Sequence, residues 1–208
     1  TKLSSDNPRR PVAELRMGMA SLQEAEALGK VENATEEQLR LRDERRRMAQ
    51  EWLTSALAAT SSELTSLHFV GAASLAQLLN DQRRFADTLK LLEQPPIAGM
   101  QRVEQSDPLV ADVNVQTNMI QSAVIAYMGQ MSEGGDVATT TDRVAGLLAL
   151  LQERLKDHPR SVQILQSYYA LTLRKLREQA ASNLSDEARQ NLTTATVKIF
   201  DPIIGPSD

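Results

Sequence analysis

Cysteine is absent from this chain of 208 residues, and glycine (9 residues), proline (8 residues) and aromatic residues (3%) are all scarce. Without cysteine there is no disulfide, no iron–sulfur cluster and no cysteine-ligated zinc. Strands favour aromatic and β-branched runs, and tight turns favour glycine and proline, so their scarcity argues against a β-rich fold. Because 41% of the residues are hydrophobic, the chain can still bury a core, and we predict an all-α protein.

An excess of either charge is also lacking. The 23 basic and 27 acidic residues give a net charge of −4, and neither half of the chain is a basic arm or an acidic tail. The arginine-rich run 40–47 is balanced by carboxylates at four-residue spacing, in the pairs Glu36–Arg40, Asp43–Arg47 and Arg47–Glu51. Such pairs stabilise an exposed helix, so we interpret the run as a solvated face and predict no nucleic-acid partner.

A membrane-spanning segment is not expected either. The longest uncharged stretch is 113–132, and it contains five side-chain amides, which are costly in lipid. The chain opens without methionine or an apolar leader, so we expect a soluble domain of a longer protein, either cytoplasmic or exported. The number of subunits and the compartment stay open.

Hydrophobic spacing predicts eight helices, with proline and glycine gathered near their ends. Thr35 and Gln38 have the spacing of a capping box, residues 80–83 are predicted to form a tight corner, and 95–108 is a candidate linker within what we expect to be a single domain, 1–208. The predicted helices cover approximately 8–28, 35–60, 61–79, 84–92, 113–133, 139–158, 159–176 and 185–200.

The stretch 74–92 places a small residue, Ala76, on one helix and an aromatic residue, Phe85, just after the corner, with leucines at 75, 79, 89 and 92. This pattern resembles a tetratricopeptide repeat, and 155–176 is a weaker echo of the junction between two repeats. The resemblance implies stacked antiparallel helical hairpins in a right-handed α-solenoid, which binds partners on its concave face. An irregular helical bundle is the alternative fold.

Residues for catalysis are few. Of the two histidines, we expect His68 to have a packed or capped role in the core and His158 to cap the C-terminal end of a helix. There is no Glu-x-x-His pair and no Gly-Lys-Ser/Thr phosphate loop. We therefore predict that the domain is not an enzyme and uses no metal or other cofactor.

The most distinctive pattern is a stripe of uncharged amides on the helix predicted at 113–133, formed by Asn114, Asn118 and Gln121 and continued by Ile125 and Met128. In tetratricopeptide repeats, amides on the inner face hold extended peptides, since an amide both donates and accepts hydrogen bonds. The resemblance thus implies a scaffold module that binds a protein or peptide through these five residues. Two alternatives remain: the amides pair between packed helices or meet water, and the domain is a structural spacer or dimerisation unit.

Overall fold

The structure is a computed structural model that describes residues 7, 9–59, 64–133, 137–159 and 161–180, together with isolated positions at 186, 190, 193, 194, 196, 197 and 200. Within these residues all regular secondary structure is helical, as the composition predicted. The described elements are α1 (Arg10–Gly29), α2 (Glu36–Ala58), α3 (Ser66–Asp81), α4 (Phe85–Glu93), α5 (Gly99–Glu104), the 3-10 turn η1 (Pro108–Val110), α6 (Val113–Ser132), α7 (Val137–Leu155) and α8 (Ser161–Ala180). The eighth predicted helix, 185–200, lies largely outside the described residues.

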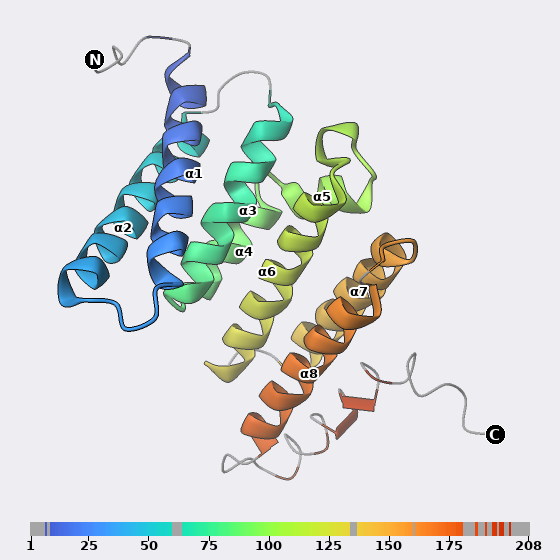
Figure 1. The fold of residues 1–208 in the computed structure, drawn as a ribbon. Helices are drawn as coiled ribbons and strands as arrows, with labels where there is room; N and C mark the ends of the chain where they lie inside the picture. The colour runs from blue at the N-terminus through green and yellow to red at the C-terminus, as the bar shows by residue number, and fades with distance from the viewer. Residues whose placement is uncertain are drawn as a thin grey trace.

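The helices follow one another across the molecule from α1 and α2, through α3, α4 and α6, to α7 and α8 (Figure 1). The main packing contacts join each helix to near neighbours in the chain, and α6 contacts five others: α3, α4, α5, α7 and α8. Of the described helices, none is both long and apolar enough to cross a membrane.

The α1–α2 hairpin depends on a close crossing at Gly18. A Cβ atom on this glycine would lie 2.7 Å from Cγ of Leu53, so the absence of a side chain lets the two helices approach. The same hairpin buries the carboxylate of Glu14, which is only 3% exposed. Arg10 pairs with Glu14 at 2.6 Å, and the Ser55 hydroxyl donates to it at 2.8 Å, so this buried charge is compensated.

Helix α2 begins as predicted. The Gln38 backbone N–H donates to Thr35 Oγ1 at 3.2 Å, and the Thr35 N–H donates to Gln38 Oε1 at 2.9 Å, which completes the capping box. Helix α3 has a related start, where the Thr65 N–H donates to Nδ1 of His68 at 3.1 Å. His68 is 5% exposed, so the expected packed position in the core is confirmed.

The charged face of α2 pairs differently from its local spacing. Arg47 and Glu51 form their predicted pair at 2.6 Å, whereas Arg45 pairs with Glu24 of α1 at 2.9 Å and Arg46 lies 3.7 Å from Asp81 of α3. Some arginines of α2 therefore pair with carboxylates of neighbouring helices rather than with carboxylates on α2 itself.

The corner between α3 and α4 is shorter than predicted. Helix α3 continues through Asn80 and Asp81, and the chain reverses at residues 82–84. Arg83 has a left-handed backbone, with φ of 60°. The N–H groups of Arg83 and Arg84 donate to the carbonyls of Asn80 and Leu79 at 2.9 and 2.8 Å, the two bonds of a Schellman motif. This termination keeps Asn80 within α3, where its side chain donates to the Ser122 carbonyl of α6.

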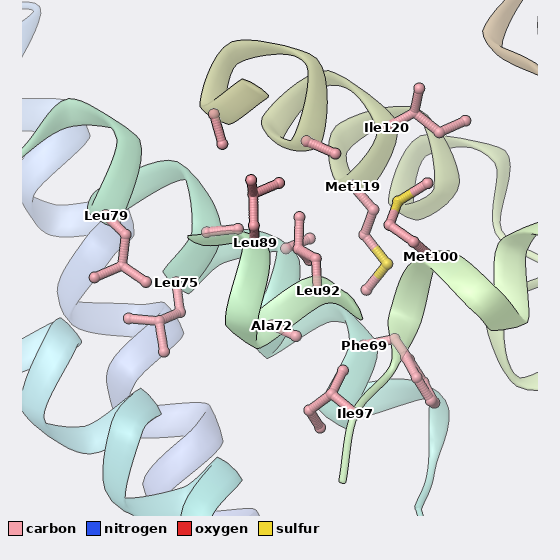
Figure 2. Packing of buried hydrophobic residues seen from close by; sticks show 14 of the residues in the cluster. Phe69, Ala72, Leu75, Leu79, Leu89, Leu92, Ile97, Met100, Met119 and Ile120 are labelled. Carbon is pink, nitrogen blue, oxygen red and sulfur yellow. The ribbon is translucent and has the colours of Figure 1, made fainter. Parts of the chain in front are cut away.

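The core continues from α3 through α4 into α6. Ala76 is fully buried, and Leu89 and Leu92 lie between the helix that carries Leu75 and the helix that carries Met119 (Figure 2). Phe85 packs on α6 rather than only filling its own hairpin, because a Cβ atom at Gly129 would lie 2.4 Å from the Phe85 ring.

The candidate linker 95–108 is itself structured. It contains α5 and the beginning of η1, and the side chains of Ile97, Met100 and Val103 are buried in the same hydrophobic cluster as α3, α4 and α6. The Arg102 guanidinium lies 5.4 Å from the centre of the Phe69 ring, an attractive cation–π distance. This segment thus packs against both the helix before it and the helix after it.

Candidate functional site

The predicted stripe on α6 is exposed near the N-terminal end of the helix and buried near its C-terminal end. Asn114 and Asn118 are exposed, and Gln121 and Ile125 are half-buried. Met128 is 2% exposed and belongs to the hydrophobic cluster, so the accessible face ends at Ile125. The N-terminal end is fixed by Asp112, whose carboxylate accepts from the Asn114 N–H at 2.8 Å.

Two cavities lie along this face. The larger, of about 570 Å³, is formed by residues from α6, α8 and the loop after α7, and the smaller, of about 270 Å³, by residues from α3, α6 and α8. The larger is lined by Asn114, Thr117, Gln121, Leu155, His158, Pro159, Gln163, Ile164, Ser167 and Tyr168. The smaller is lined by Gln77, Asn80, Asp81, Asn118, Gln121, Ser122, Ile125 and Tyr168.

Gln121 and Tyr168 belong to both cavities, and we call the combined depression the amide groove. The N-terminal halves of α6 and α8 line the larger cavity, and the C-terminal end of α3 meets the middle of α6 at the smaller one. Helices α3, α6 and α8 run in the same general direction across the molecule (Figure 1). From Asn114 to Ile125 the groove follows about 16 Å of α6, the length of about five residues of extended chain.

The groove carries little charge. Asp81 and His158 are the titratable acid and base among the described residues that line it, and no lysine or arginine is among them. Burial raises the pKa of Tyr168 to about 12, so its phenol is neutral at physiological pH. The chemistry of the walls is mainly that of amides and hydroxyls, which donate and accept hydrogen bonds without a net charge.

Two polar atoms of the groove residues have unused hydrogen-bonding capacity. Asn80 donates through Nδ2 to the Ser122 carbonyl at 2.9 Å, but its Oδ1 is buried and has no partner among the described residues. Oγ1 of Thr117 is in the same condition. Since a buried polar group without a partner costs about 1–3 kcal/mol, both residues are placed at some expense to stability.

Comparison with family models, with curated proteins and with solved structures finds no match to this chain. The site must therefore be judged from its own residues.

The amides on α6 were predicted from the sequence, but the other two walls of the groove were not. On α3, residues 77, 80 and 81 share one helical face at spacings of three and four, and on α8 so do 163, 164, 167 and 168. That spacing could have identified them as faces. It could not have shown that they meet α6, because the pairing of helices depends on tertiary packing.

A second polar cluster lies between α4, α5, α6 and α7 and is structural in character. The Tyr127 hydroxyl donates to Glu93 at 2.7 Å, and Arg143 bridges Glu93 and Glu104 at 3.3 and 2.8 Å. Desolvation and the neighbouring Glu93 carboxylate raise the pKa of Tyr127 to about 12. The cluster is internally paired, so it joins helices and leaves little capacity for a ligand.

Within the described part of the chain, no group of three or more histidine, aspartate or glutamate side chains gathers closely enough to hold a metal ion. His158 lines the larger cavity, and its backbone N–H donates to the Leu155 carbonyl at 2.9 Å, at the end of α7.

Proposed function

We propose that this domain is a non-enzymatic binding module that holds an extended peptide segment along the amide groove. The observation that carries the proposal is the composition of the walls: three roughly parallel helices supply Gln77, Asn80, Asn118, Gln121 and Gln163 to two adjoining cavities that share Gln121 and Tyr168. An extended peptide exposes unpaired N–H and C=O groups, and side-chain amides can satisfy both.

We further propose that the helices form a divergent tetratricopeptide-like solenoid. In this assignment α3, α6 and α8 are the first helices of successive hairpins, and α4 and α7 are the second helices. Support comes from the packing of α4 against both α3 and α6, and of α7 against both α6 and α8. Each unit then buries its apolar face against its neighbours, and the groove lies on the side formed by the first helices.

The proposal is tested with a display library of random 12-residue peptides selected against the purified chain. Asn118→Ala combined with Gln121→Ala is expected to weaken selected peptides by about tenfold, since two hydrogen-bonding partners are lost. Fluorescence anisotropy measures the affinity. The melting temperature should change by less than about 2 °C, because these side chains are exposed or half-buried.

The matched control is Gln152→Ala combined with Gln166→Ala. Both are exposed helical glutamines, on α7 and α8, that do not line the groove. This variant should bind as wild type does. If no peptide is enriched, or if the two double variants bind equally well, the groove is not a peptide site.

A further inference from the structure

The two ends of the amide groove differ in chemistry. In the smaller cavity, the described lining residues include one carboxylate, Asp81, and no cation. The Asn80 side chain is held in place by the hydrogen bond that Nδ2 donates to the Ser122 carbonyl, and its buried Oδ1 has no partner among the described residues. The formal charge on the described lining of this cavity is therefore negative, and a cationic ligand group that donates hydrogen bonds would complement it.

Asp81 occupies a position that α3 itself disfavours. It is the last residue of that helix, where the negative end of the helix dipole opposes a carboxylate. Its nearest recorded cation is Arg46 on α2, at 3.7 Å, and the Asp81 side chain is 49% exposed. Asp81 also lines a separate cavity with Arg46 and Arg47 of α2, and about half of its side chain remains accessible.

The same cavity also offers apolar surface, from Ile125 and the ring of Tyr168. Lysine and arginine combine a long apolar stem with a charged, donor-only head. The apolar surface beside the Asp81 carboxylate therefore suits a lysine or arginine side chain of the ligand better than an acidic or a short aliphatic side chain.

The larger cavity has a different preference. Leu155, Pro159 and Ile164 contribute to its lining, so it favours an apolar side chain. On α6 the centres of the two lining sets are about four residues apart, or about 6 Å. That distance spans about two residues of extended chain, and side chains at positions i and i+2 of an extended segment lie on the same side.

We propose that the amide groove selects extended segments that carry lysine or arginine two residues away from an apolar residue, with the basic side chain beside Asp81. This inference rests on the proposed function and adds the chemistry of its ligand.

The experiment repeats the library selection with wild type, Asp81→Asn and Asp87→Asn. Asp87 is a close control: its side chain is also 49% exposed and pairs with an arginine, at 2.7 Å, and it lies outside the groove lining. Both substitutions change the net charge by the same amount. Wild type and Asp87→Asn are expected to enrich a basic residue two positions from an apolar one, and Asp81→Asn is expected to lose the basic preference.

A selected lysine peptide then gives the quantitative test. Asp81→Asn should weaken it about three- to tenfold, and Asp87→Asn by less than about twofold. Replacing the lysine by norleucine, which keeps the stem and removes the charge, should produce the same loss in wild type and no further loss in Asp81→Asn. High salt should weaken the lysine peptide more than the norleucine peptide.

The outcomes separate this inference from the proposed function. Peptides that depend on Asn118 and Gln121 but show no basic preference would overturn the role of Asp81 and leave peptide binding intact. Equal effects of Asp81→Asn and Asp87→Asn would also overturn it, since only the net charge would then matter. Failure to select any groove-dependent peptide would remove both.

Discussion

Helices α2 and α6 have similar lengths, 23 and 20 residues, but their polar residues follow different rules. Helix α2 lies on one side of the fold and buries only Ala49, Leu53, Ala56 and Leu57, so its charged residues are exposed or half-buried. Helix α6 contacts five other helices, and several of its polar side chains are buried. A polar residue on α2 can be interpreted from its neighbours in sequence, whereas one on α6 depends on which helix covers it.

Gln116 and Asn118 illustrate the point within α6 itself. Gln116 is 6% exposed and donates to the Val110 carbonyl at 2.7 Å, while Asn118, two residues later, is exposed and lines the amide groove. The two have the same type of side-chain group. Their different roles, one in fixing the chain before α6 and one on the surface, are set by the packing around the helix.

The largest expected effect is on α6, at Gly129. In Gly129→Ala the new methyl group would lie 2.4 Å from the Phe85 ring, so the aromatic ring or the helix must shift. Overpacking of this kind costs about 1–3 kcal/mol, a fall of about 2–12 °C in melting temperature for a domain of this size. Thermal and urea unfolding followed by circular dichroism measure it.

Gly146→Ala on α7 is the control, because no atom of the described residues lies within 4 Å of the position that its Cβ would occupy. Alanine should stabilise this exposed helical position by about 0.5–1 kcal/mol. If both variants are equally stabilised, α6 does not pack on Phe85 as described.

The next effect tests whether α2 is governed by its own sequence. Thr35→Ala removes the side-chain acceptor of the capping box and is expected to cost about 1 kcal/mol. Thr54→Ala, in the exposed interior of the same helix, should be neutral or slightly stabilising because alanine has the higher helix propensity. Equal free energies of unfolding for the two variants would contradict the cap.

A smaller, pH-dependent effect extends the comparison to the buried cap of α3. Burial lowers the pKa of His68 from its ordinary value of 6.5, although its hydrogen bond with Thr65 acts in the opposite direction. The unfolded chain therefore binds a proton more readily, so this residue should reduce stability as the pH falls below about 6.5. At pH 6 we expect the loss in the free energy of unfolding to be a fraction of that caused by Thr35→Ala.

The measurement compares urea unfolding of wild type and His68→Gln between pH 7.5 and 5.5. Glutamine can still accept from the Thr65 N–H, as Gln38 does in α2, but it does not titrate. The difference in stability between the two proteins should shift in favour of the variant as the pH falls. A constant difference would show that His68 does not contribute to the pH dependence.

The smallest effect concerns the exposed Arg47–Glu51 pair. A double-mutant cycle with alanine should give a coupling free energy of about 0.3–0.5 kcal/mol. Asp43 is also four residues from Arg47, but it is engaged by Arg42 at 2.8 Å. The Asp43–Arg47 cycle should therefore give a coupling close to zero, and equal couplings would mean that spacing alone decides these pairs.

Several helices show which features could be predicted from the sequence and which could not. The capping box of α2, and the leucines at 75, 79, 89 and 92 on α3 and α4, follow from spacing within one helix, and they were predicted. The end of α3 was placed two residues early, because a left-handed arginine rather than a glycine terminates it. The amides of α6 were found, but their partners on α3 and α8 were not.

By itself, the sequence determined that the described chain is helical, which faces of several helices are apolar and where their caps begin, since those features depend on neighbours within about one helical turn. Tertiary structure decided which polar residues of α6 are buried, that Phe85 packs on Gly129, and that the residues of α3, α6 and α8 line one groove. Those outcomes require segments distant in sequence to pack together, and no local spacing specifies their contacts.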